Sequence, residues 1–190
     1  MADSLQFKLD GVEDLKRELR AAPEKIRRLA VRGALRKAGR VISTAAKAAA
    51  PVLAVPTKTR RPGTVKRAIR VATSKFARRT GDEGVYIGVR PLRGRRQVKL
   101  GKAGATNPND PYYWWFVEFG TAAHKIRARK GKRLGLAPSY PRVVSHPGTT
   151  GAGFMASAAR EKGQEAVGVF MREAIPQIEK LNAKALTSGR

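Results

Sequence analysis

Between Lys25 and Gly81 the chain carries 17 lysines and arginines over 57 residues, without a single aspartate or glutamate. The whole sequence of 190 residues holds 40 basic and 14 acidic residues, for a formal net charge of +26. Self-repulsion of this size destabilises a compact fold unless an anion lies close by. The charge pattern therefore predicts an anionic partner, either nucleic acid or an acidic protein surface.

The rest of the composition limits the class of protein. Hydrophobic residues make up 42% of the chain, which is above the range of disordered chains and sufficient for one domain with a core over residues 1–190. Cysteine is absent, which excludes disulfides and thiolate metal sites. The N-terminal residues lead into no apolar run, and no apolar segment approaches about 18 residues. We therefore expect neither a signal peptide nor a membrane partner.

Residues 5–50 are predicted to form an N-terminal strand and two helices. Apolar and polar residues alternate over residues 5–9, which predicts a short strand, and Asp10-Gly11 is a turn signal. Apolar residues then recur at helical spacing from Val12 to Leu19, which predicts a short helix. Pro23 suits the first position of a second helix, because its missing N–H costs nothing there.

The second helix is predicted to be long and amphipathic and to end near Ala50, before Pro51. Its apolar side consists mainly of small residues, which lets a neighbouring element pack closely: Ile26, Ala30, Gly33, Ala34, Ala38, Val41 and Ala45. Four arginines follow the opposite side in steps of four: Arg28, Arg32, Arg36 and Arg40. Such a row is either a solvated face or a contact surface, and the absence of alternating acidic residues favours contact.

Residues 51–63 are predicted to form an exposed, basic, proline-rich arm, and residues 64–146 a sheet with basic loops. A helical turn leading into a strand is expected over residues 64–73, and a strand over residues 84–89. Short strands are plausible around 125–127 and 142–145, and 93–104 is expected to be a basic loop. Together with the arginine row, we assign these cations to contact with DNA or an acidic partner: Lys58, Arg60, Arg61, Arg95, Arg96, Arg129, Lys130 and Arg133.

The segment of residues 112–119 reads YYWWFVEF and contains both tryptophans of the chain. As a strand it would be largely apolar on both faces, so we expect it to be central in the sheet or covered by another subunit. Base stacking ranks lower, because the aromatic residues are contiguous rather than interleaved with arginine or lysine. The residues assigned to subunit packing are Tyr113, Trp114, Trp115, Phe116, Glu118 and Phe119. For Glu118, a buried carboxylate, we hypothesise an ion pair with an arginine within or between subunits.

Residues 147–186 form the predicted C-terminal helical region, with the helix running from Phe154 to about Leu186. Pro176 should kink or divide it. The expected fold class is α+β, in which the long amphipathic helix and the C-terminal helix pack on an antiparallel sheet with extended basic loops.

The residues needed for catalysis are sparse. The two histidines, His124 and His146, have no cysteine or carboxylate at ligand spacing, and no spacing forces two acidic residues together. The glycines form neither a Walker A motif nor a dinucleotide fingerprint. We therefore predict no catalytic residue, no metal, no cofactor and no enzymatic activity.

Four short segments follow one another in a recognisable order. They are LDGVEDL at residues 9–15, AAKAAAP at 45–51, the aromatic segment ending in EFGT at 113–121, and HPGT followed by FM and Ala158 at 146–158. Together they resemble the family of tailed-phage minor tail or neck proteins, also called tail-completion or gene-product-ten-like proteins. Two departures stand out: Gly153 occupies a position where the family usually has proline, and the arm after Pro51 lacks the common Thr-Gly-x-Leu.

This resemblance implies a structural virion protein at the head–tail junction of a phage, of siphovirus type, that assembles in the host cytoplasm. It implies a homo-oligomeric ring, expected to be a hexamer, around the DNA channel. Its partners would be tail-tube or tail-terminator proteins, head-completion or portal proteins, and genomic DNA. Composition alone favours an alternative, a sequence-neutral RNA- or DNA-binding protein of ribosome-associated or nucleoid type.

Overall fold

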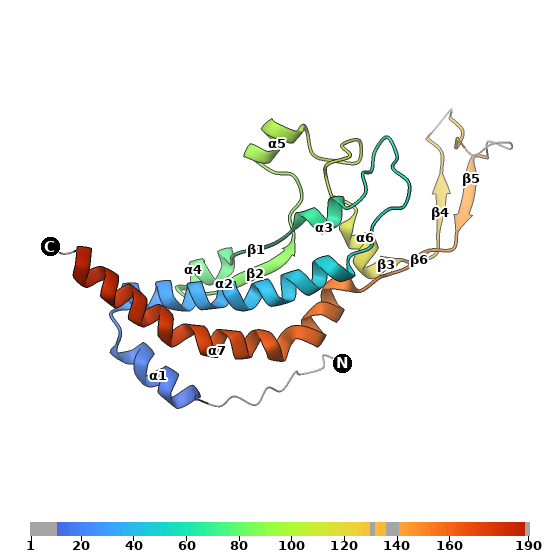
Figure 1. Ribbon diagram of the computed structural model, residues 1–190. Coiled ribbons are helices and arrows are strands. Elements are labelled where there is room, and N and C mark those ends of the chain that lie inside the picture. The colour runs from blue at the N-terminus through green and yellow to red at the C-terminus, as the bar shows by residue number, and fades with distance from the viewer. Residues whose placement is uncertain (1–10, 130–131, 136–140, 189–190) are drawn as a thin grey trace.

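Two long helices that run antiparallel to each other form the centre of the fold (Figure 1). The structure is a computed structural model, and it describes residues 11–129, 132–135 and 141–188. The two central helices are α2 (Glu24–Ala49) and α7 (Phe154–Ser188). The strand predicted over residues 5–9 lies outside the described residues.

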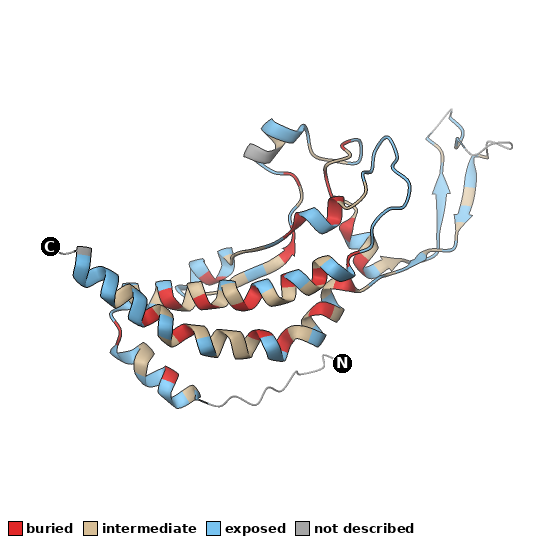
Figure 2. Ribbon diagram, viewed as in Figure 1, coloured by how far each residue is buried: buried red, intermediate tan, exposed pale blue. Residues whose placement is uncertain are grey.

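Small side chains form the contact between α2 and α7. Ala30, Ala34 and Ala46 of α2 and Ala174 of α7 are fully or almost fully buried, and the buried residues follow the facing sides of both helices in Figure 2. This face is the one that the 3.6-residue pattern predicts for α2. An ion pair between Lys37 and Glu173 also links the two helices.

The two central helices are covered on opposite sides. Helix α1 (Val12–Ala21) packs through Leu15 and Leu19 against α7 and the adjoining part of α2. On the other side, strands β1 (Ile69–Thr73) and β2 (Val85–Val89) form an antiparallel pair that covers α2. The short helices α3 (Thr64–Ala68) and α4 (Lys75–Thr80) precede and follow β1. The helical turn leading into a strand over residues 64–73 and the strand near 84–89 are therefore confirmed.

The α+β class is confirmed, and the described strands form three separate two-stranded sheets rather than one. Besides β1–β2, strand β3 (Gly120–Thr121) pairs with β6 (Thr149–Thr150). Strand β4 (His124–Arg127) pairs with β5 (Val143–His146), close to the two short strands predicted there. The β4–β5 hairpin projects away from the helices and is largely exposed (Figures 1 and 2).

Two elements differ from the prediction. The aromatic segment forms a short helix, α6 (Trp114–Phe119), instead of a strand. Residues 93–104, expected to be a loop, contain α5 (Arg95–Leu100). In addition, α7 continues through Pro176 as one helix, so the proline does not divide it. None of the helices in the described part of the chain combines the length and the apolarity needed to cross a bilayer.

Candidate assembly and anion-contact surfaces

Helix α6 places its aromatic residues on two opposite sides. Trp114 and Glu118 are buried, at 7% and 4% exposure, and lie one helical turn apart. Trp115, Phe116 and Phe119 are exposed at 53%, 55% and 66%. The ring of Trp115 stacks on that of Phe119, with centroids 5.1 Å apart. We call Trp115, Phe116 and Phe119 the aromatic face; exposed apolar clusters of this kind mark surfaces that bind other chains.

The turn at each end of α6 explains why these residues form a helix. At its start, the N–H of Trp114 donates to the carbonyl of Pro111 at 2.9 Å. At its end, Gly120 adopts a φ of 75°, which L side chains rarely adopt. A Cβ at Gly120 would also lie 2.1 Å from the carbonyl oxygen of Thr149. The close strand pairing at residue 120 therefore requires glycine and fixes where the helix ends.

Within the chain, the carboxylate of Glu118 binds the N-terminus of α7 rather than an arginine, which corrects the hypothesis of an ion pair inside one subunit. Its two oxygens accept hydrogen bonds from the backbone N–H groups of Met155 and Ala156, at 2.9 and 3.0 Å. These N–H groups belong to the first turn of α7, where they have no partner within the helix. The positive end of the helix dipole also favours a negative charge there. Glu118 is thus a helix cap supplied by a distant segment.

The two sequence segments EFGT and HPGT come together in the structure. Thr121 pairs with Thr149 between β3 and β6, and their hydroxyl oxygens lie 3.1 Å apart. A Cβ at Gly148 would lie 2.3 Å from the carbonyl oxygen of Thr121, so glycine permits this close approach. The paired EFGT and HPGT segments therefore join α6 to the start of α7. They also hold together the two ends of the β4–β5 hairpin.

Two of the four arginines in the row pair with a carboxylate of the chain. The carboxylate of Glu83 accepts hydrogen bonds from Nε of Arg28 at 3.0 Å, and from Nε and Nη2 of Arg32 at 2.7 and 2.8 Å. The Glu83 side chain is only 8% exposed. The Arg32 hydrogen bonds, aided by Arg28 and opposed by desolvation, lower the pKa of Glu83 from 4.5 to about 2. Glu83 thus supplies the counter-charge that the acid-free stretch lacks.

The rest of the row lies further along α2. Arg36 is exposed and donates to the hydroxyl of Thr73 at 3.0 Å, and Arg40 is exposed. The row therefore follows the flank of α2 beside the β1–β2 sheet. Arg36 and Arg40 keep their place among the candidate contact residues, whereas Arg28 and Arg32 are held by Glu83.

The arm and the loops present their cations in different ways. Lys58 and Arg129 are exposed, the guanidinium of Arg60 lies 4.8 Å from the ring centroid of Tyr113, and Arg61 makes a long hydrogen bond of 3.4 Å to Asn109. Arg133 is exposed. Lys130 and the side chains of Arg95 and Arg96 lie outside the described residues. The cations assigned from sequence therefore occupy several surfaces rather than one site.

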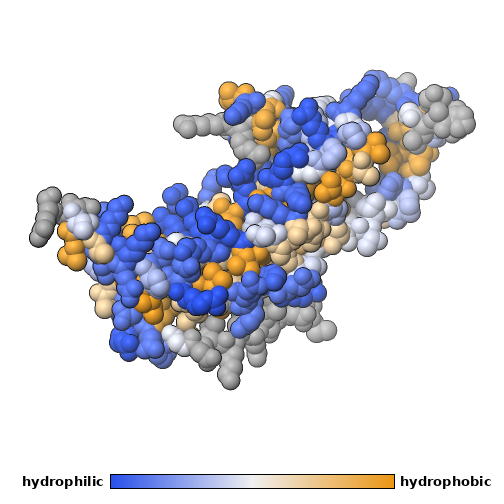
Figure 3. All heavy atoms as spheres, viewed as in Figure 1, coloured by the Kyte–Doolittle hydropathy of each residue, from blue (hydrophilic) through white to orange (hydrophobic). Residues whose placement is uncertain are grey.

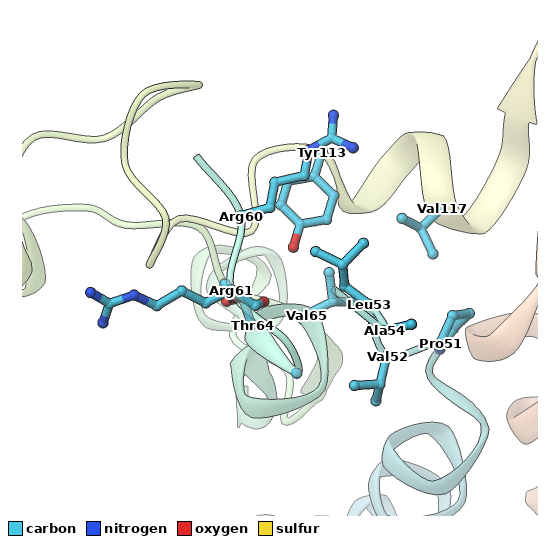
Figure 4. Close-up of a pocket in the computed structure, with 11 residues that line it drawn as sticks. Pro51, Val52, Leu53, Ala54, Arg60, Arg61, Thr64, Val65, Tyr113 and Val117 are labelled. Carbon is cyan, nitrogen blue, oxygen red and sulfur yellow. Dashed lines mark hydrogen bonds between the residues drawn. The ribbon is translucent and has the colours of Figure 1, made fainter. Parts of the chain in front are cut away.

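A cavity of about 310 Å³ opens between the start of the arm and α6 (Figure 4). Val52, Leu53 and Val65 contribute apolar side chains, and Tyr113 and Val117 line it from the α6 side. Burial raises the pKa of the Tyr113 hydroxyl, and the charge of Arg60 opposes this rise. The cavity is thus a mainly apolar hollow bordered by the arm, α3 and the α6 segment.

Sequence reasoning missed the residues that order the segment between β2 and α6. Asp110, at 1% exposure, accepts hydrogen bonds from the N–H groups of Leu92 and Gly104, at 3.1 and 2.8 Å. Asn107 donates to the carbonyls of Leu100 and Lys102, both at 2.9 Å. The cluster Asn-Pro-Asn-Asp-Pro at residues 107–111 was the available signal, since Asn and Asp side chains bond nearby backbone in turns.

The fold and the exposed surfaces together define a class of protein. The chain is an α+β protein whose surfaces carry exposed aromatic residues and many cations, and Figure 3 shows hydrophobic patches set among mainly hydrophilic residues. Over the described ranges, no group of three or more potential metal ligands is placed to hold an ion. Such surfaces are suited to binding other macromolecules.

The family described as "Bacteriophage HK97-gp10, putative tail-component" matches residues 13–120, more than half of the chain, and the chain belongs to this family. The match runs from α1 to the end of α6 and so includes the arginine row, the arm and the aromatic face. Searches of curated proteins and of solved structures found no match. The protein is therefore a component of a bacteriophage tail.

Proposed function

We propose that this tail component acts at the head–tail junction as a structural protein, in a ring of identical subunits around the DNA channel, and joins the tail tube to the head-completion proteins. The observation that carries the proposal is the aromatic face. Three large apolar side chains lie exposed on one short helix at 53–66%. A surface of this kind is costly in water and is suited to contact with another chain.

The charge is consistent with a position beside the DNA. The formal net charge of +26 remains after every acidic residue of the chain is counted, and Arg40, Lys58 and Arg129 are exposed. Contact with DNA through such residues would be sequence-neutral, because arginine and lysine would meet phosphates rather than base edges. About six phosphate contacts would give a log–log slope of binding against salt of roughly −5.

The location in the virion tests the junction role. Antibody labelling of purified virions, viewed by electron microscopy, is expected to mark the point where head and tail meet. Label at the distal tip of the tail, or no label on virions, would overturn the proposal. Free monomers that bind RNA tightly, with no protein in the virion, would instead support the nucleic-acid-binding alternative.

A variant of the aromatic face tests the subunit contact. Phe116→Ser with Phe119→Ser is expected to abolish incorporation into virions and leave the unfolding of the monomer nearly unchanged, because both side chains are exposed. The control is Val98→Ser with Leu186→Ser, which changes two apolar residues on α5 and α7 that are even more exposed, at 90% and 80%. Equal incorporation of both double variants into virions would mean that the aromatic face does not take part in the subunit contact.

A further inference from the structure

A hollow that no sequence motif indicated lies on the outer side of the β1–β2 sheet. Its larger part, about 400 Å³, lies between the sheet and α6, and a second part of about 350 Å³ continues towards α4. Lys75, Tyr86 and Arg90 line both parts. We call the combined hollow the basic trough.

The strand register explains why the basic trough has an aromatic floor. Tyr86 pairs with Ala72 and lies on the side of the sheet that faces away from α2, whereas the neighbouring Ile87 faces α2. The Tyr86 ring lies along the strand over Gly88, because a Cβ at residue 88 would be 2.3 Å from the tyrosine hydroxyl oxygen. Phe76 on α4, exposed at 72%, borders the smaller part. The glycine thus lets the tyrosine ring lie flat at the bottom of the hollow.

The charges that line the basic trough all have one sign. Lys75, Arg90 and Arg93 are exposed at its sides, and none of the described residues that line either part is acidic. Glu83, which follows α4 in the sequence, is occupied by the two arginines of α2. The trough therefore has a positive potential and apolar ring surfaces in the same hollow, which together select an anionic ligand with apolar parts.

The arrangement of the rings distinguishes between two anionic ligands. Stacking of nucleic acid bases requires open ring faces. The Trp115 ring is already engaged by two rings of its own chain, Trp114 with centroids 4.1 Å apart and Phe119 at 5.1 Å. One side of the Tyr86 ring lies against Gly88. The open face of Tyr86 alone does not provide the successive platforms that stacked bases need, whereas exposed ring edges carry partial positive charge and attract carboxylates.

We propose that the basic trough binds an acidic segment of a partner protein. Lys75 and Arg93 pair with carboxylates of the segment, and the exposed edges of Tyr86 and Trp115 contact its apolar atoms. This binding surface goes beyond the role at the head–tail junction and does not require a ring. It makes an acidic protein, rather than DNA, the anion at this part of the surface.

The position of the tryptophans makes the trough directly observable. The chain has two tryptophans, and both line the larger part of the trough. Ligand binding in the trough should therefore change the intrinsic fluorescence, while binding to distant basic surfaces should not. The probe is a short oligoglutamate, titrated at physiological ionic strength, where the attraction of distant charges is screened.

The expected result is a saturable change of tryptophan emission that Lys75→Gln with Arg93→Gln weakens by roughly fivefold, as the loss of two exposed charge pairs predicts. The matched control is Arg160→Gln with Lys184→Gln, which removes the same charges from exposed positions on α7 and should leave the affinity nearly unchanged.

Three results would overturn the proposal. The first is unchanged emission while a labelled oligoglutamate binds, and the second is an equal loss of affinity in the control variant. The third is tighter binding of an oligothymidylate of equal charge than of the oligoglutamate, with the same change of tryptophan emission and the same dependence on Lys75 and Arg93. That result would make the trough a nucleic-acid site. None of these results affects the junction proposal, because that is read from the location in virions.

Discussion

Three carboxylates with little exposure, Glu83, Asp110 and Glu118, connect distant parts of the chain. Glu83 binds two arginines of α2, Asp110 binds backbone between β2 and α6, and Glu118 binds the first turn of α7. In a chain with 14 acidic and 40 basic residues, the cations far outnumber the carboxylates with which they could pair. Sequence could show that such residues need partners, but the partners of Glu83 and Glu118 lie far away along the chain, and those of Asp110 and Glu118 are backbone N–H groups.

Replacing Glu83 by glutamine should destabilise the fold by about 2 kcal/mol at neutral pH, because it removes charge-assisted hydrogen bonds and leaves Arg28 and Arg32 without a counter-charge. The pKa of Glu83 is lowered on folding, so its contribution is complete above pH 4.5 and is lost as the pH falls towards about 2. Urea unfolding across this range measures the difference between wild type and variant.

The control for this prediction is Glu165→Gln. Glu165 is half exposed and pairs with Lys162 one helical turn away, so its loss should cost less than about 0.5 kcal/mol. A stability difference between wild type and Glu83→Gln that is the same at pH 2 and at pH 7 would contradict the role given to the ionised carboxylate.

Replacing Glu118 by glutamine should destabilise the start of α7 by about 2 kcal/mol, because the amide nitrogen would face a backbone N–H in place of a second acceptor. Hydrogen exchange at Met155 and Ala156 should accelerate, while exchange in the middle of α7 should change only through the lower overall stability. Glu161→Gln, at an exposed position on the same helix, serves as the control. Unchanged protection of Met155 and Ala156 would show that the cap contributes little.

At the scale of elements, local patterns predicted the two long helices correctly but predicted a strand where the structure has helix α6. The small apolar residues of α2 recur with helical period, and the structure buries them against α7. The aromatic segment has strong strand propensity, but that preference depends on cross-strand neighbours, and the described structure gives α6 no adjacent strand along its length. The spacing of Trp114, Val117 and Glu118 fits one side of a helix, and this is the period that the sequence interpretation overlooked.

The joint between α6 and β3 gives a test at this scale. Gly120→Ala should destabilise the protein by about 3 kcal/mol, because a Cβ would meet the carbonyl of Thr149 in addition to the strained φ of 75°. Gly81→Ala isolates the second effect, since Gly81 has a φ of 82° with no atom within 4 Å of a Cβ, and should cost about 1 kcal/mol. Thermal unfolding compares the two; equal losses would mean that the close contact at Gly120 relaxes freely.

At the scale of the whole molecule, the large positive net charge is the property that the sequence shows directly. The layered packing of α1, the two central helices and the β1–β2 sheet could be predicted only as an α+β class, because non-local contacts such as β3–β6 leave no local pattern. The basic trough likewise depends on three segments that fold together, from α4, β2 and α6.

The net charge predicts a salt effect opposite to that of a protein stabilised by surface ion pairs. Screening should weaken the self-repulsion of +26, so the melting temperature should rise as sodium chloride is added from low to moderate ionic strength. Scanning calorimetry at several salt concentrations checks this. A melting temperature that falls steadily with salt would mean that the ion pairs at Glu83 and Glu173 outweigh the repulsion.

The pairing of β3 with β6 has a consequence for how the chain can change in length. It holds the two ends of the excursion over residues 122–148 next to each other, and the β4–β5 hairpin within that excursion makes few contacts with the rest of the described structure. Because the closure entropy of a loop grows slowly with its length, residues can be added to or removed from the hairpin with little effect on the helices. The β4–β5 hairpin can thus differ in length while the packing of the helices stays the same.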